Sequence, residues 1–250
     1  MNDNEAPFGG DLAQYHANYR RYPRERDKAG LRILEDIREE FSGTVRIVDI
    51  GAGWGSYAYH IRNEIRDCEV SAIELDEACI QSYKTEPDLQ GINAIFADIM
   101  AAQVTERWDI ASTVAVTCVY PQAQFEQMIS AISDLISPGG YYIGWEMIHG
   151  VDQELEIKET HADISDILCI RSTKNVSTVF EGAGFSAIRF LPFEMPFDME
   201  PVKSAVEWSG KATDIRMAHL KSHTIQTDNG RLSFRGAMYQ PWCHVIAQKL

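Results

Sequence analysis

The chain has 250 residues, of which 45% are hydrophobic, and a formal net charge of −14. This length and composition suffice to bury one sizeable core, so we expect a single domain over 1–250. No stretch approaches the ~20 apolar residues that cross a bilayer, and the polar N-terminus lacks the apolar region of a signal peptide. The negative net charge argues against nucleic-acid binding, because such binding relies on clustered Lys and Arg. We therefore expect a soluble, cytoplasmic protein with neither nucleic acid nor membrane as a partner.

The five cysteines are odd in number and scattered along the chain, without a CxxC pair. This pattern favours neither a disulfide framework nor a structural zinc site, and we expect buried free thiols. Metal-dependent catalysis is also not expected, because 116–124 offers no carboxylates that could converge on an ion.

Strand-like and helix-like segments alternate along most of the chain. Apolar residues at helical spacing or in short β-branched runs predict helices over 28–41, 56–65, 76–86, 123–136 and 176–184, and strands over 45–50, 69–75, 93–99, 108–117, 141–147, 185–194 and 243–249. The charged run 152–163 is typical of the solvated face of a helix. We expect partial helix over 200–222 and a hairpin around 228–230. The alternation predicts an α/β fold, a mostly parallel sheet covered on both faces.

A glycine-rich loop follows the first predicted strand, with Gly51, Gly53 and Gly55 leading into a helix. Glycine is needed where the backbone turns tightly against a ligand. Dinucleotide sites use similar loops, but their third small position would here be Ser56 rather than Gly or Ala. Asp49 would also repel a pyrophosphate, whereas it suits a ligand with an ammonium and a sulfonium.

Two further acids end the next predicted strands. Glu74 can accept hydrogen bonds from both hydroxyls of a ribose, and Asp98 can accept one from an adenine amino group. A single such acid is explained by a solvated loop or a helix cap. Three acids at the carboxyl edge of successive strands favour a shared ligand.

The ordered strings VDIGAGWG, IELD, FADI, WDIA, LISPGGYY and FEGAGF resemble the motif series of class I S-adenosylmethionine-dependent methyltransferases over about 30–195. This resemblance implies a doubly wound, Rossmann-like sheet of seven strands with the last one antiparallel. It divides the chain into an N-terminal lid over 1–27, a cofactor-binding core over 28–195, and substrate-side additions with the final strand over 196–250. It implies S-adenosylmethionine as the cofactor, bound by Asp49, Gly51, Ala52, Gly53, Gly55, Glu74, Leu75, Asp98, Ile99, Thr113 and Val114.

Candidate catalytic residues must lie at the same edge of the sheet as the cofactor. Glu146 and His149 follow the fifth predicted strand, and Tyr120 follows the fourth. His149 is a candidate general base, although a lone loop histidine is more often a surface residue. Glu146 is equally well read as a hydrogen-bonded wall of the pocket. His161 could reach the site if 152–166 formed a lid.

Aromatic and basic residues gather near both ends of the chain. We expect the N-terminal segment to close over the cofactor through Tyr15, Tyr19 and Tyr22, with Arg20 or Arg21 facing a carboxylate. Near the C-terminus, candidates for substrate contact are Arg231 and Arg235, whereas core packing explains Trp242.

The leading hypothesis is methyl transfer to oxygen or nitrogen of a small molecule such as a sugar or a specialised metabolite. A protein or RNA methyltransferase would need a basic surface or a recognition domain, and neither is evident. A catalytically silent cofactor-binding protein of the same fold is a third hypothesis, and a nicotinamide dehydrogenase is disfavoured by Asp49 and Ser56. The sequence does not determine the oligomeric state.

Overall fold

The structure is a computed structural model that describes residues 12–101, 104–161, 164–193, 223–227, 230–234 and 241–250. The partial helix expected over 200–222 and the side chain of Arg235 lie outside these residues.

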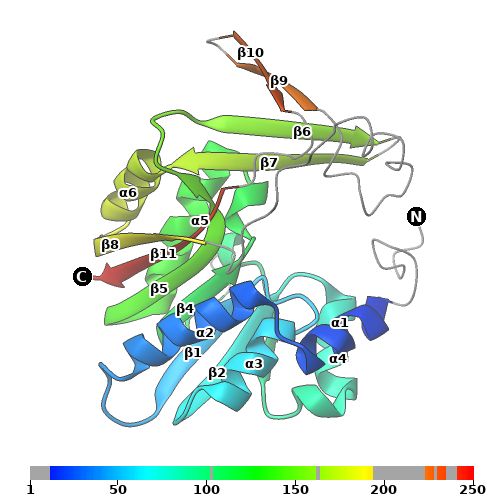
Figure 1. The fold of residues 1–250 in the computed structure, drawn as a ribbon. Helices are drawn as coiled ribbons and strands as arrows, with labels where there is room; N and C mark the ends of the chain where they lie inside the picture. The colour runs from blue at the N-terminus through cyan, green and yellow to red at the C-terminus, as the bar shows by residue number, and fades with distance from the viewer. Residues whose placement is uncertain (1–11, 102–103, 162–163, 194–222, 228–229, 235–240) are drawn as a thin grey trace.

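Seven strands form the expected sheet, in the order β3-β2-β1-β4-β5-β11-β8 (Figure 1). Neighbours from β3 to β5 pair in parallel. The final strand, β11, runs antiparallel between β5 and β8, which confirms the predicted topology. The strands are β1 Val45–Ile50, β2 Cys68–Glu74, β3 Asn93–Phe96, β4 Trp108–Val114, β5 Ile136–His149, β8 Phe185–Pro192 and β11 Trp242–Lys249.

Helices cover both faces of this sheet, as a parallel sheet with crossover connections requires. One face packs against α2 and α3, and the other against α5 and α6. The helical spacing of Leu31, Leu34 and Ile37 puts all three into the first of these cores. The helices are α1 Leu12–Arg21, α2 Glu25–Arg38, α3 Ser56–Glu64, α4 Glu77–Thr85, α5 Gln122–Leu135 and α6 Thr173–Gly182, with short 3-10 turns η1 Pro87–Leu89, η2 Ile99–Ala101 and η3 Thr117–Val119.

The helix interpretation of 152–163 is wrong. β6 Leu155–His161 and β7 Ile164–Ser172 pair in antiparallel fashion, and the ribbon crosses the top of the view in Figure 1, away from α1–α4. The reason is a period of two, in which Leu155 and Ile157 alternate with charged residues. Leu155 is buried in a small cluster and Ile157 packs against it.

The ribbon joins the main sheet through two register pairs only. Ile148 pairs with Arg171 and His149 with Ser172, so β7 runs parallel to the end of β5. Nearer the C-terminus, β9 His223–Thr227 and β10 Gly230–Phe234 form the predicted hairpin. Within the described ranges, no helix combines the length and apolar character that a membrane crossing requires.

Candidate functional site at the carboxyl edge of the sheet

The loop after β1 adopts backbone conformations that favour glycine. Gly51, Gly53 and Gly55 have φ angles of +66°, +51° and +78°, in the left-handed region that L side chains rarely adopt. A Cβ on Gly51 would lie 2.7 Å from a methyl carbon of Val116, whereas a Cβ on Gly53 would meet nothing within 4 Å. Gly51 is therefore required by packing as well as conformation, and the loop leaves open space beside Gly53.

An open pocket of about 410 Å³ lies next to this loop, where β1, β2 and β3 end. We call it the edge pocket. It brings together five of the residues predicted to bind the cofactor, namely Gly51, Glu74, Leu75, Asp98 and Ile99. Ile50, Ile73, Ala97, Met100, Val116 and Met128 supply apolar walls, and Tyr120 completes the lining. Apolar walls with a few converging polar groups are typical of a small-molecule site.

Glu74 links the second strand to the glycine loop. Its Oε2 accepts a hydrogen bond from the Gly53 amide at 2.7 Å, and its Oε1 accepts from the amides of Leu75 at 2.6 Å and Asp76 at 3.0 Å. A carboxylate has about four lone-pair positions, and these three bonds leave about one. Glu74 can therefore accept from one ribose hydroxyl while its orientation is fixed.

Asp98 follows β3 and accepts a hydrogen bond from the Met100 amide at 2.9 Å through Oδ1. This bond fixes the carboxylate at the start of η2, in the wall of the edge pocket. The lining of this pocket fits an adenosine group, because two carboxylates can accept hydrogen bonds from it and apolar walls can pack against its base.

Asp49 is deeply buried, and not at an open surface. Its Oδ1 accepts a hydrogen bond from the Ser112 hydroxyl at 3.2 Å, across the β1–β4 pair. Burial, with smaller contributions from the carboxylates of Asp27 and Glu74, raises the pKa of Asp49 to about 7. A cationic group placed beside this side chain would favour its charged form.

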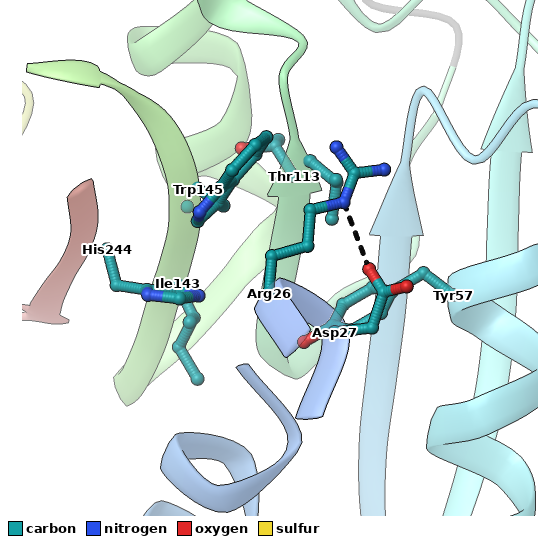
Figure 2. A pocket seen from close by; sticks show the side chains of 9 residues that line it. Arg26, Asp27, Tyr57, Thr113, Ile143, Trp145 and His244 are labelled. Carbon is teal, nitrogen blue, oxygen red and sulfur yellow. Dashed lines mark hydrogen bonds and ion pairs between the residues drawn. The ribbon is translucent and has the colours of Figure 1, made fainter. Parts of the chain in front are cut away.

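A second, small cavity, with room for about one water molecule, lies between the first turn of α2 and strands β4, β5 and β11 (Figure 2). We call it the α2 cavity. Thr113 and Val114, predicted to face the methyl donor, line it together with Arg26, Asp27, Tyr57, Ile143, Gly144, Trp145 and His244. Because Ile50 and Thr113 are register partners and Ile50 lines the edge pocket, the two cavities open on adjacent strands.

Glu146 lies in the interior and holds the turn that follows β4. Its Oε1 accepts from the Thr113 hydroxyl at 2.9 Å and from the amides of Val116 and Thr117 at 3.3 and 3.2 Å. Its Oε2 accepts from the Cys118 amide at 3.1 Å. Burial raises the pKa of Glu146, and these hydrogen bonds oppose the rise. Glu146 lines neither the edge pocket nor the α2 cavity.

The other catalytic candidates lie in different surroundings. His149 is buried at the end of β5, with Nε2 at 2.6 Å from the carbonyl oxygen of Gln153. Tyr120 lines the edge pocket beside Glu74 and Asp98, and burial is the main cause of its raised pKa. The structure therefore does not bring His149 and Tyr120 into one cavity. The side chain of His161 lies outside the described residues.

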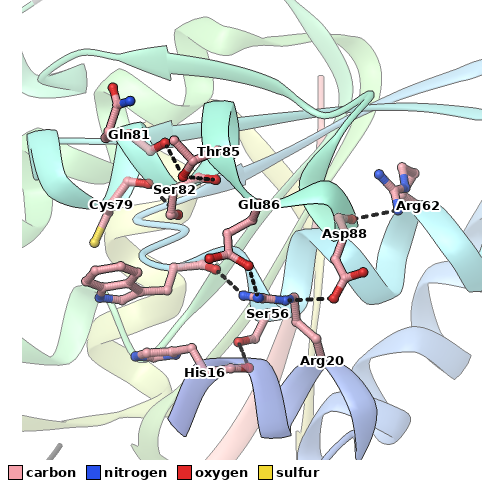
Figure 3. A network of polar contacts seen from close by, with 11 residues as sticks. His16, Arg20, Ser56, Arg62, Cys79, Gln81, Ser82, Thr85, Glu86 and Asp88 are labelled. Carbon is pink, nitrogen blue, oxygen red and sulfur yellow. Dashed lines mark hydrogen bonds and ion pairs between the residues drawn. The ribbon is translucent and has the colours of Figure 1, made fainter. Parts of the chain in front are cut away.

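The N-terminal helix α1 packs on the glycine loop and α3 (Figure 3). Arg20 is 5% exposed, and its guanidinium donates to the Trp54 carbonyl oxygen at 3.4 Å and to Glu86 at 3.1 Å, with Asp88 at 3.7 Å. The imidazole of His16 stacks on the Trp54 indole, with ring centroids 5.8 Å apart. Arg20 thus faces carboxylates of the chain itself and fixes α1 over the glycine loop.

Sequence reasoning missed Arg171 and Arg26. Arg171 is buried and donates to the carbonyl oxygens of Thr117, at 3.1 Å, and Tyr120, so it holds the same turn as Glu146 from the other side. Arg26 lies with its guanidinium carbon 4.6 Å from the centroid of the Trp145 ring. Arg171 belongs to a segment that was assigned no role. Arg26 belongs to the predicted N-terminal lid, where only Arg20 and Arg21 were singled out as basic residues.

The described residues contain no cluster of three or more side chains suited to holding a metal ion. All five cysteines are free thiols. Arg231 lies in β10, and Trp242 and His244 lie in β11, where Trp242 stacks on Trp145 at a centroid distance of 3.7 Å.

Comparison with known proteins agrees with this geometry. Residues 47–140 match a family model described as a methyltransferase domain. A search of curated proteins gave no match in sequence.

Several solved structures share the fold. An S-adenosylmethionine-dependent methyltransferase from Clostridium acetobutylicum is similar with a TM-score of 0.59 and 8% identity, covering 94% of this chain and 96% of that one. CalS10, an amino pentose methyltransferase from Micromonospora echinaspora with S-adenosylmethionine bound, is similar with a TM-score of 0.55 and 14% identity. The match covers 95% of this chain and 97% of that one. The glycopeptide N-methyltransferase MtfA in complex with sinefungin is similar with a TM-score of 0.55 and 14% identity, covering 88% of this chain and 85% of that one.

The sheet order and the similar solved structures give this chain a fold that it shares with S-adenosylmethionine-dependent methyltransferases. The match to a methyltransferase domain covers residues 47–140, from β1 to the start of β5.

Proposed function

We propose that this protein transfers the methyl group of S-adenosylmethionine to a small-molecule acceptor. The observation that carries the proposal is the edge pocket, where Gly51, Glu74 and Asp98 converge from three consecutive strand ends. The bound cofactor would supply an electrophilic methyl on a sulfonium. Glu74 would bind the ribose, Asp98 and Ile99 the adenine, and Asp49 with the glycine loop the methionine end.

The chain's own contribution to catalysis is mainly orientation. In-line displacement at a methyl carbon gains most from holding the reacting atoms at near-attack distance. Arg20 fixes the glycine loop from outside, while Glu146 and Arg171 fix the turn after β4. A small acceptor, rather than a nucleic acid, is supported by the net charge of −14. The five free thiols support a location in the reducing cytoplasm.

Calorimetric titration with S-adenosylhomocysteine, with NAD in parallel, tests the cofactor assignment. We expect micromolar binding of S-adenosylhomocysteine, weakened at least about tenfold, or about 1.4 kcal/mol, in Glu74→Gln and Asp98→Asn. Asp134→Asn removes an exposed carboxylate on α5, outside the edge pocket, and is the matched control. Preferential binding of NAD, or affinity that Glu74→Gln leaves unchanged, would contradict the proposal.

A further inference from the structure

The α2 cavity contains hydrogen-bonding groups that the cofactor site does not use. Trp145 is 7% exposed, and none of the described residues accepts a hydrogen bond from its Nε1–H. Its ring faces are covered, one by Trp242 at 3.7 Å between centroids and one by the Arg26 guanidinium. Only the edge of the indole is left to the cavity. A buried donor without an acceptor calls for an explanation, and a bound ligand is one.

His244 lies directly opposite Trp145. The two residues are register partners in the antiparallel β11–β5 pair, so their side chains leave the same face of the sheet with Cβ atoms about 5 Å apart. Figure 2 shows both side chains at the cavity, with the nitrogen-bearing end of Trp145 on the side of His244. A Cβ placed on Gly30 would lie 2.5 Å from the Tyr57 hydroxyl and 3.5 Å from His244 Nε2. The hydroxyl and the imidazole therefore border the same gap.

We propose that the α2 cavity binds the reacting hydroxyl group of the methyl acceptor, with Trp145 Nε1 donating to its oxygen and His244 accepting its proton. This inference rests on the proposed methyltransferase function and assigns the acceptor atom as oxygen. The cavity is placed for this role because Asp27 and Tyr57 in its lining lie near the Asp49 carboxylate: in addition to burial, the charge of Asp49 raises the pKa of Tyr57, and the charge of Asp27 raises the pKa of Asp49.

The chemistry of the paired groups distinguishes oxygen from nitrogen. A hydroxyl oxygen has two lone pairs, so it can accept the Trp145 hydrogen bond with one and attack the methyl carbon with the other. A neutral amine has a single lone pair, which cannot serve both purposes at once. In the transfer, the O–C bond forms as the C–S bond breaks and leaves its electron pair on sulfur. The hydroxyl proton passes to the His244 imidazole and then to water.

The surroundings of His244 keep it in the form that accepts a proton. Burial lowers the pKa of His244 to about 4, and the Asp27 carboxylate opposes this only weakly. The charged groups that border the cavity are Arg26 and Asp27 from α2, and Tyr57 from α3 is the other titratable group. The imidazole is therefore neutral at pH 7. Departure of the sulfonium charge during transfer lowers the electrostatic penalty for the imidazolium that forms.

Indole N–H signals in ¹⁵N NMR spectra test the binding mode without turnover. With saturating S-adenosylhomocysteine, phenol and methyl α-glucoside are the hydroxyl probes, and aniline is the amine matched to phenol. We expect a hydroxyl probe to shift the Trp145 signal, identified by its loss in Trp145→Phe, and aniline to shift it at least about fivefold less. The Trp108 signal should stay in place, because its Nε1 donates to Ser71. A Trp145 signal that no hydroxyl probe moves, or that aniline moves equally, overturns the proposal.

Turnover measurements with radiolabelled S-adenosylmethionine and a panel of hydroxyl compounds and their amino counterparts give a second readout. We expect methyl ethers as products, and a fall in kcat of at least about thirtyfold in His244→Asn with S-adenosylhomocysteine affinity within twofold of wild type. The acid limb of the pH–kcat profile should disappear in that variant. N-methylated products, or an unchanged kcat and pH profile, overturn the inference. Failure of wild type to bind S-adenosylhomocysteine would instead contradict the proposed function.

Discussion

Replacement of Asp49 by Asn should change how the stability of the protein depends on pH. The carboxylate is buried, and its pKa is raised from 3.8 to about 7. Between these values the folded state holds a proton that the unfolded state has released, so the free energy of unfolding falls as pH rises. The loss is complete above pH 7. At about 1.4 kcal/mol per pH unit, wild type should lose about 2 kcal/mol between pH 5.5 and 8.

Asp49→Asn cannot ionise, so this loss should be absent from it. Urea unfolding at pH 5.5 and 8 measures the difference. Ser112→Ala removes the hydrogen bond that stabilises the Asp49 carboxylate and should extend the fall of stability to higher pH. Asp36→Asn, on the exposed side of α2, should follow wild type. Parallel pH profiles of wild type and Asp49→Asn would refute the reasoning.

The same ionisation should appear in cofactor binding. If Asp49 contacts the cationic methionine end, binding favours the carboxylate and releases a proton below pH 7. Affinity for S-adenosylmethionine should then rise by up to about tenfold per pH unit from pH 6 to 7 and level off above it. Calorimetry in buffers of different ionisation enthalpy counts the released protons. Binding without proton release at pH 6 would show that Asp49 does not face the cation.

Four further substitutions follow from the site. Glu146→Ala leaves buried amides without acceptors and should lower the free energy of unfolding by about 3 kcal/mol or more; a loss of turnover at unchanged stability would instead favour a direct catalytic role. Gly51→Ala should lower the free energy of unfolding by at least about 2 kcal/mol, because its Cβ would contact Val116. Gly53→Ala should lower it by only about 1 kcal/mol, because it adds backbone strain without a steric contact. Equal losses of the two variants in urea unfolding would contradict this. Arg20→Ala should weaken S-adenosylhomocysteine binding about tenfold by freeing the glycine loop, and unchanged affinity in calorimetry would limit Arg20 to a structural role.

The sequence predicted the elements whose signals are local. A β-branched run ending at Gly51 predicted β1 with its observed bounds, and the alternation of strands and helices predicted the layers. The acids Glu74 and Asp98 could be placed at one edge because parallel strands end together there. The ribbon was missed because charged residues in β6 masked the alternation of Leu155 and Ile157.

The contacts of individual side chains were beyond sequence reasoning. Glu146 and His149 are three residues apart in the chain, yet one accepts hydrogen bonds from the turn after β4 and the other contacts Gln153. The cross-strand partnership of Trp145 and His244 depends on the β11–β5 register. A shift of one residue would have put them on opposite faces. No local pattern near the C-terminus fixes that register.

The β6–β7 ribbon is attached to the main sheet at its foot. Arg171 and Ser172 pair with β5 there, and Arg171 also holds the turn that brings Tyr120 to the edge pocket. Leu155 and Ile170 add a small buried cluster beside the foot. Beyond these contacts, we expect the ribbon to accommodate an insertion or an affinity tag without a change in the edge pocket, provided that the buried cluster and Arg171 are kept.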